Sequence, residues 1–184
     1  MGTYRIVGLT NSARSASYNR MALQLAAEVM PSDLALQVHD LSAIPFYDTD
    51  LEKAGFPPAV QSLAEAVSGA SGIVIACPEF NHSMPAVLKN ALDWLSRVPG
   101  QPLDGQPVMI LSASYGRLGG ARVQYDLRRV LDAVGARPLV RPEVFIGMAH
   151  EKFDHAGRCI DEGTRRMVKE QAIAFKEWIN QIRR

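Results

Sequence analysis

Runs of apolar residues alternate along the chain with segments in which apolar residues recur every three or four positions. Five of the runs have the length of a β-strand, and the middle ones are almost entirely apolar, as in parallel strands covered on both faces. They are Tyr4 to Thr10, Leu34 to Val38, Gly72 to Cys77, Val108 to Ser114 and Leu139 to Ile146. The pattern therefore predicts five buried strands.

Segments with helical spacing follow the apolar runs, and four of them place their apolar residues on one helix face. The four faces are Met21, Leu25 and Val29; Val87, Leu88, Ala91, Leu92 and Leu95; Leu127, Val130, Leu131 and Val134; and Val168, Ala172, Phe175, Ile179 and Ile182. Alternating strands and helices predict an α/β fold, a doubly wound parallel sheet with helices on both faces. Five strands match the flavodoxin-like order 2-1-3-4-5 better than the longer dinucleotide-binding form. Several prolines fall between the periodic segments, where they interrupt neither type of element: Pro45, Pro57, Pro58, Pro99, Pro102 and Pro107.

Composition narrows the class of protein. The 184 residues are 47% hydrophobic, which predicts one well-buried domain over residues 1–184. A net charge of +1 from 20 basic and 19 acidic residues disfavours nucleic acid and anionic membranes as partners. No apolar stretch approaches the roughly 20 residues that span a bilayer and no signal peptide is evident, so we expect a cytoplasmic protein. Cys77 and Cys159 are too far apart to suggest a disulfide framework or a metal site, and Cys77 is expected to be a small buried residue.

The first connection of chemical interest, residues 10–20, joins the first strand to the first helix. It offers hydroxyls, an amide and the guanidinium of Arg14. Amides at a helix N-terminus and the positive end of the helix dipole attract an anion, and Arg14 can add a charged hydrogen bond, so we expect a phosphate here. The spacing is neither that of a nucleotide-hydrolysing loop nor the dinucleotide fingerprint. Equally consistent is a structural reading, in which Ser12, Ser15 and Ser17 are turn or cap residues and Arg14 is a solvated charge.

The second connection, residues 78–85, follows the third strand. Ser83 at or near the N-cap and Pro85 in the first turn predict the start of the next helix. Glu79 and Asn81 do not cap that helix at the usual offset, so we interpret them as ligand-binding residues. A turn or interface role is favoured for His82 over a contact with substrate. On the following helix, the spacing predicts surface or interface positions for three residues and packing for a tryptophan: Lys89, Asn90, Asp93 and Trp94.

The third connection, residues 112–120, follows the fourth strand and is rich in glycine and serine. Glycine lets the backbone approach a flat ligand closely, although Gly119 and Gly120 are also consistent with a helix start. In an open α/β sheet, polar loops at the carboxyl ends of the strands face one crevice, which is where such folds bind ligands. The convergence of the three loops carries more weight than any one of them.

With these motifs, the chain resembles the NADPH-dependent FMN reductase family of flavodoxin-like flavoproteins, which includes quinone, chromate and azo-dye reductases. The resemblance runs nearly end to end. The matching residues are Ser12, Arg14, Ser17 and Asn19; Pro78 to Pro85; Leu88 to Trp94; Ser112, Ser114, Gly116, Gly119, Gly120 and Arg122; and a late segment from Lys152 to Thr164. The chain departs from the family pattern at Asn11 and Ala86, where glycine is usual, and at Phe80, where tyrosine is commoner. The missing tyrosine hydroxyl removes one possible hydrogen bond near the flavin or substrate.

The resemblance implies bound FMN, with NAD(P)H as the hydride donor. Its phosphate would be held by one group of residues, with Tyr18 beside them: Ser12, Arg14, Ser17 and Asn19. The ribityl chain and ring would be surrounded by a second group: Pro78, Glu79, Phe80, Asn81, Ser114, Tyr115 and Gly116. No catalytic side chain is expected, because a flavin performs hydride and electron transfer itself. Donor and acceptor would use the same face in turn, which predicts ping-pong kinetics with quinones or similar acceptors such as flavins, azo dyes and chromate.

The family resemblance also implies a homodimer or homotetramer. Arg122, Tyr125 and Glu143 suit an interface, although a solvated helix face and an ordinary sheet edge explain them equally well. Two alternative functions are a flavodoxin-like electron carrier that binds FMN without turning over NAD(P)H, and a flavin-free interaction module. The balanced charge disfavours the carrier, because carriers usually dock through a one-sided charged surface. The sequence has no motif that identifies the acceptor or separates NADPH from NADH.

Overall fold

The computed structural model describes residues 3–10 and 16–183, in which strands and helices alternate. The elements are β1 (Tyr4–Thr10), α1 (Tyr18–Val29), β2 (Leu34–Asp40), α2 (Thr49–Ala54), α3 (Pro58–Ser68), β3 (Gly72–Ala76), α4 (Ala86–Leu95), β4 (Pro107–Ala113), α5 (Ala121–Ala133), β5 (Arg137–Pro138), β6 (Val144–Ile146), α6 (Ala149–Lys152) and α7 (Glu162–Ile182). Every strand pair is parallel, and the order is β2-β1-β3-β4-β5, with β6 also beside β4. The predicted α/β class and the 2-1-3-4-5 order are confirmed.

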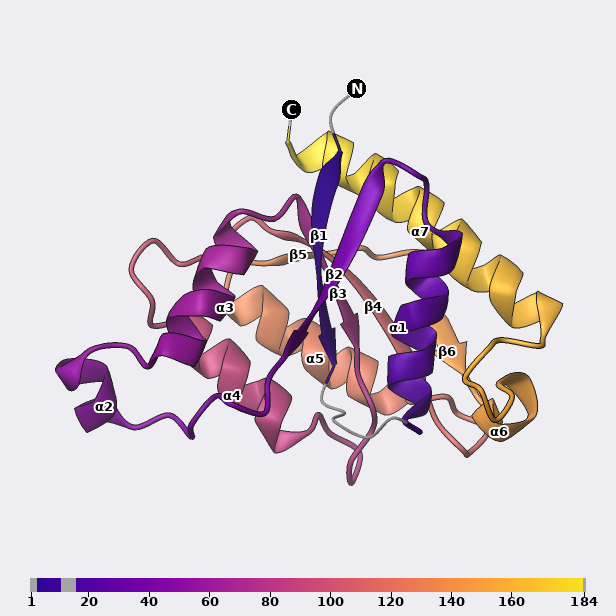
Figure 1. The fold of residues 1–184 in the computed structure, drawn as a ribbon, viewed down its shortest axis with the longest axis horizontal. Helices are drawn as coiled ribbons and strands as arrows, with labels where there is room; N and C mark the ends of the chain where they lie inside the picture. Colours follow the sequence, from indigo (N-terminus) through magenta and orange to yellow (C-terminus); the bar gives the residue numbers. More distant parts are fainter. Residues whose placement is uncertain (1–2, 11–15, 184) are drawn as a thin grey trace.

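Helices cover both faces of the sheet (Figure 1). On one face α3, α4 and α5 pack on side chains such as Ile73, Ile75 and Ile110. On the other, α1 and α7 pack on Val74, Met109 and their neighbours. Because consecutive strand residues point to opposite faces, a strand buried on both sides must be apolar throughout, which explains the uninterrupted run in β3.

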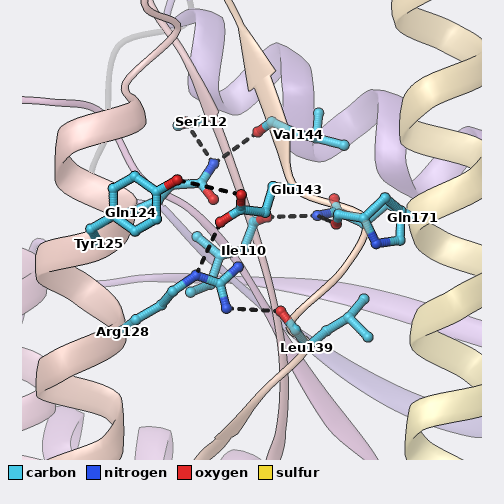
Figure 2. Close-up of polar contacts among 10 residues, drawn as sticks. Ile110, Ser112, Gln124, Tyr125, Arg128, Leu139, Glu143, Val144 and Gln171 are labelled. Carbon is cyan, nitrogen blue, oxygen red and sulfur yellow. Dashed lines mark hydrogen bonds and ion pairs between the residues drawn. The ribbon is translucent and has the colours of Figure 1, made fainter.

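The predicted fifth strand is wrong as one element. Two short strands, β5 and β6, pair with the first and last parts of β4, and the chain leaves the sheet between them after the Leu139 amide has bonded Val108 (2.7 Å). Side chains from the flanking helices bond the backbone there (Figure 2). Arg128 of α5 donates to the Leu139 carbonyl (2.8 Å), and the Gln171 amide of α7 donates to the Ile110 and Pro142 carbonyls (2.9 Å each). Backbone carbonyls without a strand partner need such donors, so these side chains stabilise the interruption between β5 and β6.

Between β2 and β3 the structure has two helices, α2 and α3. The hydrophobic pattern of the sequence did not identify the apolar face of α3. Four residues of α3 are buried at helical spacing: Val60, Leu63, Ala64 and Val67. Pro58 is the first residue of this helix rather than a residue between elements, and Pro107 begins β4. Both positions tolerate proline, because the first turn of a helix and the start of a strand do not need its missing N–H.

In the described part of the chain, none of the helices has both the length and the apolar character that crossing a membrane requires. Residues 3–10 and 16–183 also contain no group of three histidine, cysteine or acidic residues placed to hold a metal ion.

Candidate functional site

The three predicted loops leave the same edge of the sheet. Thr10 at the end of β1 is in register with Ala76 of β3, and Ala76 with Leu111 near the end of β4. The strands are parallel, so the segments that follow them begin side by side, as the sequence predicted. In Figure 1 this edge is where α1, α4 and α5 begin.

The β1–α1 connection is described from residue 16 onward, so Ser12 and Arg14 lie outside the described residues. Ser17 is the N-cap of α1, and its hydroxyl accepts from the Arg20 amide at 3.5 Å, which is long for a hydrogen bond. The first turn of α1 contains no acidic residue. The positive end of the helix dipole is therefore not compensated by a carboxylate of that turn, which favours a bound anion.

Asn19 of α1 is buried and uses both ends of its amide on the end of β4. Its Nδ2 donates to the Ala113 carbonyl (2.8 Å), and its Oδ1 accepts from the Ala113 amide (2.9 Å). Tyr18 beside it is half-buried, with its ring centre 6.4 Å from that of Phe153. Asn19 therefore joins the end of the first loop to the start of the third.

The loop after β3 forms a two-residue hairpin turn. The backbones of Phe80 and Ser83 exchange two hydrogen bonds, of 2.9 and 3.0 Å. Between them, Asn81 and His82 have φ angles of 50° and 68°. Two consecutive left-handed residues are the signature of a type I′ turn, in which asparagine is among the few favourable residues. The sequence interpretation of Asn81 as a ligand-binding residue overlooked this preference, and the turn gives Asn81 a structural role in addition to any ligand role.

Glu79 also has a structural role that its sequence position did not reveal. Its carboxylate pairs with Arg122 (3.1 Å) and accepts from the Val123 amide (3.4 Å) in the first turn of α5. It thereby caps α5, the helix that follows the third loop. In the sequence, Glu79 was considered only as a cap of the helix that follows its own loop. A carboxylate at this position also offsets the positive end of the α5 dipole.

Helix α4 begins within a few residues of Ser83, as predicted, but Ser83 is not its N-cap and Pro85 precedes its first turn. The N-cap of α4 is Pro85, and Ser83 donates instead to the Asp126 carboxylate on α5. Asp126 in turn pairs with Arg129 (3.0 Å). The second loop is thus fastened to α5 at Glu79 and at Ser83.

Farther along α4, Asn90 is buried rather than at the surface. Its amide accepts from the Tyr47 backbone (2.7 Å) and donates to the Pro45 carbonyl (2.8 Å), which also accepts from the Trp94 indole (2.8 Å). These bonds hold the segment after β2 against α4, and the predicted packing role of Trp94 is confirmed. Lys89 and Asp93 are partly exposed and pair with each other (2.6 Å).

The loop after β4 is held by a segment that sequence reasoning did not connect with it. The Ser114 amide donates to Ile146 (3.0 Å), and the amides of Met148 and Ala149 donate to Gly116 (3.1 Å) and Ser114 (3.0 Å). A side chain on Gly119, whose φ is +60°, would come within 2.6 Å of the Phe145 backbone. The only sequence signal of this contact is the pair of glycines where the two backbones meet, Gly119 and Gly147.

A buried amide supports the same loop from below. Ser112 donates to the Gly119 carbonyl (2.6 Å). Gln124 of α5 donates to the Ser112 hydroxyl and the Val144 carbonyl (2.8 Å each), as Figure 2 shows. Gln124 is fully buried among the apolar residues of α5. An amide on an apolar helix face is the signal that would have identified this support.

Cys77, at the base of the second loop, is buried as expected. Burial raises the pKa of its thiol to about 12, and the nearby Asp126 and Glu79 carboxylates act in the same direction. At neutral pH the thiol is therefore protonated and a poor nucleophile, so this loop offers no cysteine chemistry.

This edge suits an anionic, planar group such as FMN. The α1 N-terminus suits a phosphate, and the Thr10 hydroxyl at the end of β1 is buried with no hydrogen-bond partner among the described residues. A side chain on Gly116 would meet nothing within 4 Å, so the backbone of the third loop is open to a flat ligand. Phe80 and Tyr115, at 57% and 67% exposure, present apolar rings on the second and third loops. A bound flavin would supply hydride and electron transfer, so the protein would need to bind and orient it rather than provide a catalytic side chain.

Comparison with known proteins agrees with this chemistry. The profile of the NADPH-dependent FMN reductase family matches residues 4–151. The chain is 43% identical over 179 residues to an NAD(P)H-dependent FMN reductase of Pseudomonas aeruginosa and 40% identical over 182 residues to a quinone reductase of Escherichia coli. Each of these alignments covers 97% of this chain and 97% of the relative. The flavoenzyme NAD(P)H:(acceptor) oxidoreductase FerB of Paracoccus denitrificans superposes with a TM-score of 0.90 at 27% identity, over 97% of this chain and 98% of that one. The chain therefore belongs to the NADPH-dependent FMN reductase family, a family of flavodoxin-like oxidoreductases.

Proposed function

We propose that this protein binds FMN at the carboxyl edge of its sheet and uses NAD(P)H to reduce quinones. The observation that carries the proposal is the convergence of three loops beside an α1 N-terminus without an acidic first turn. Family membership favours an enzyme over the flavodoxin-like carrier, and the Escherichia coli relative is named a quinone reductase. Flavins, azo dyes and chromate remain predicted acceptors.

The phosphate is assigned to Ser12, Arg14, Ser17 and Asn19, as the family pattern implies, with Tyr18 beside them. Asn19 would also hold this loop against β4, since its amide bonds Ala113 at both ends. The flavin ring and ribityl chain are assigned to a group on the other two loops: Pro78, Glu79, Phe80, Asn81, Ser114, Tyr115 and Gly116. Glu79 would act chiefly by fixing the second loop on α5.

A spectroscopic titration tests the reaction directly. Protein is supplied with FMN, freed of excess, and treated anaerobically with NADPH and then with a quinone. Bleaching of the flavin band by NADPH and its return with quinone are expected. Bound flavin that both NADPH and NADH leave oxidised would favour the carrier, and a protein that retains no flavin would overturn the site. Parallel initial-rate lines are expected, because donor and acceptor would share one site, whereas intersecting lines would contradict the shared site.

The phosphate assignment has its own test in Arg14→Ala. Loss of a charged hydrogen bond is expected to weaken FMN binding by about 1.5–3 kcal/mol. Arg20→Ala is the matched control, since Arg20 is an exposed cation in the first turn of α1 that is not among the residues assigned to the phosphate. An Arg14→Ala dissociation constant equal to that of the control would remove Arg14 from the site.

We further propose a homodimer or homotetramer that helps to close the flavin pocket. Tyr125 on α5 is 56% exposed, and its hydroxyl lies 3.4 Å from Glu143 of the same chain. Sedimentation together with specific activity on dilution tests this proposal. Activity should fall as the oligomer dissociates, and constant activity down to a demonstrated monomer would reject the shared pocket. A cytoplasmic location stays a prediction.

A further inference from the structure

Tyr115 of the third loop stacks on His150 of α6. The two ring centres are 3.9 Å apart and the planes are inclined by 12°. Tyr115 is nevertheless 67% exposed, whereas the His150 side chain is 26% exposed. One ring therefore lies on the edge where the flavin is proposed to bind, and the other supports it from within the structure.

The backbone on both sides of Tyr115 is fixed to the segment that precedes His150. Ser114 bonds Ile146 and Ala149, and Gly116 accepts from Met148. These bonds set where the Tyr115 Cα lies, but they do not hold its side chain. The imidazole of His150 does so, because a stacked neighbour restricts the rotation of an otherwise exposed ring.

No hydrogen bond within the described residues accounts for the position of His150 itself. Its Nδ1 is buried without a partner there, and its Nε2 lies 3.7 Å from the Glu151 carboxylate, beyond hydrogen-bond distance. Its well-defined contact is the stack. A half-buried histidine whose ring stacks on an exposed tyrosine of the candidate site suggests a role in that site.

We propose that His150 is a positioning residue that holds the Tyr115 ring in place for the isoalloxazine ring of FMN. The inference rests on the proposed function and adds to it a residue that lies in none of the three sequence-predicted loops. His150 acts through Tyr115 and takes no part in hydride or electron transfer. It sets affinity for the flavin ring and leaves the grip on the phosphate unchanged.

Three variants separate stacking from general packing: His150→Ala removes the stack, His150→Phe keeps it, and His155→Ala alters an exposed histidine outside the site. Affinity is measured by fluorescence titration with FMN and with lumiflavin, which has the ring but no phosphate. His150→Ala should weaken the binding of both ligands by about threefold to tenfold, as expected for one aromatic pair. His150→Phe and His155→Ala should stay within about twofold of the unaltered protein.

A second readout uses the protein without flavin. In NMR spectra, the ring protons of Tyr115 should be displaced by the ring current of His150, and this displacement should disappear in His150→Ala. An unshifted Tyr115 in the unaltered protein, or equal FMN affinity of His150→Ala and the unaltered protein, would overturn the inference. A loss of affinity that His150→Phe does not restore would overturn it as well. Failure of the unaltered protein to bind FMN would instead overturn the proposed function, so the two failures are distinguishable.

Discussion

The turn after β3 is closed by its own backbone, whereas the loop after β4 is closed by a segment much later in the chain. In the first, Phe80 and Ser83 bond each other around two left-handed residues. In the second, Ser114 and Gly116 bond residues that follow β6, and Ser112 and Gln124 hold the loop from below. Both loops present an exposed aromatic ring at the same edge of the sheet.

This difference separates two ways of positioning a binding residue. A local turn depends on the intrinsic preferences of a few residues, so a substitution there should have a small and local effect. A loop closed by distant backbone depends on close packing, so a substitution at the contact should affect both segments. The second loop should therefore tolerate change better than the third.

The sharpest way to break the third loop is Gly119→Ala. The new Cβ would lie 2.6 Å from the Phe145 backbone, in a residue whose φ is +60°. Strain and overpacking together should lower the free energy of unfolding by about 3 kcal/mol, measured by urea denaturation. The matched control is Gly116→Ala in the same loop, where nothing lies within 4 Å of the Cβ position. Its effect should stay within about 0.5 kcal/mol, and equal effects of the two variants would show that the close backbone approach is not what closes this loop.

The support below the loop is tested by Gln124→Leu. Removal of the amide leaves the Val144 carbonyl without this donor, so the free energy of unfolding should fall by about 2 kcal/mol. Gln171→Leu is the control, because the buried Gln171 amide also donates two hydrogen bonds, but to the Ile110 and Pro142 carbonyls near the break between β5 and β6. Both variants should lose similar stability, and only Gln124→Leu should speed hydrogen exchange of the Gly119 and Met148 amides. Equal exchange in the two variants would contradict a specific role for Gln124.

The same contrast explains how much of the fold was predictable. Strand order and class followed from apolar runs and helical spacing, because burial on both faces of a sheet leaves a strong pattern in the sequence. The fifth strand was predicted as one run because residues 139–146 are largely apolar. The break between β5 and β6 is stabilised by Arg128 and Gln171, side chains of helices elsewhere in the chain.

In the candidate site, the position of each loop was predictable and its construction was not. Parallel topology alone brings the three loops to one edge. The cap that Glu79 provides for α5, and the contact of residues 114–116 with residues 146–149, join segments that are distant in sequence. No local pattern specifies such contacts. Asn81 is different, because its preference for left-handed backbone was available in the sequence and was interpreted only as ligand chemistry.

Two substitutions of Asn81 separate its turn role from a ligand role. Asn81→Ala should lower the free energy of unfolding by about 1 kcal/mol, because alanine adopts the left-handed conformation less readily. Asn81→Gly should stay within about 0.5 kcal/mol of the unaltered protein, since glycine accepts that conformation. If the side chain also binds FMN, both variants should weaken FMN affinity equally. Full affinity in Asn81→Gly would leave Asn81 as a turn residue alone.

The smallest effect is expected at the ion pair of Glu79 and Arg122, which joins the second loop to the start of α5, the helix that follows the third loop. The two side chains are 14% and 49% exposed, so solvent screens much of their attraction. A double-mutant cycle with Glu79→Gln and Arg122→Met should give a coupling energy of about 0.5–1 kcal/mol in low salt, and less in 1 M salt. Glu79→Gln keeps an oxygen that can accept from the Val123 amide, so the cycle isolates the charge from the cap. The Lys89–Asp93 pair is the control, because both of its residues lie within α4.

Hydrogen exchange shows whether this ion pair affects the third loop. If the Gly119 amide exchanges more slowly with the pair intact than in the variants that lack it, the second loop helps to hold the third loop. If the pair changes only the free energy of unfolding, each loop keeps its shape independently.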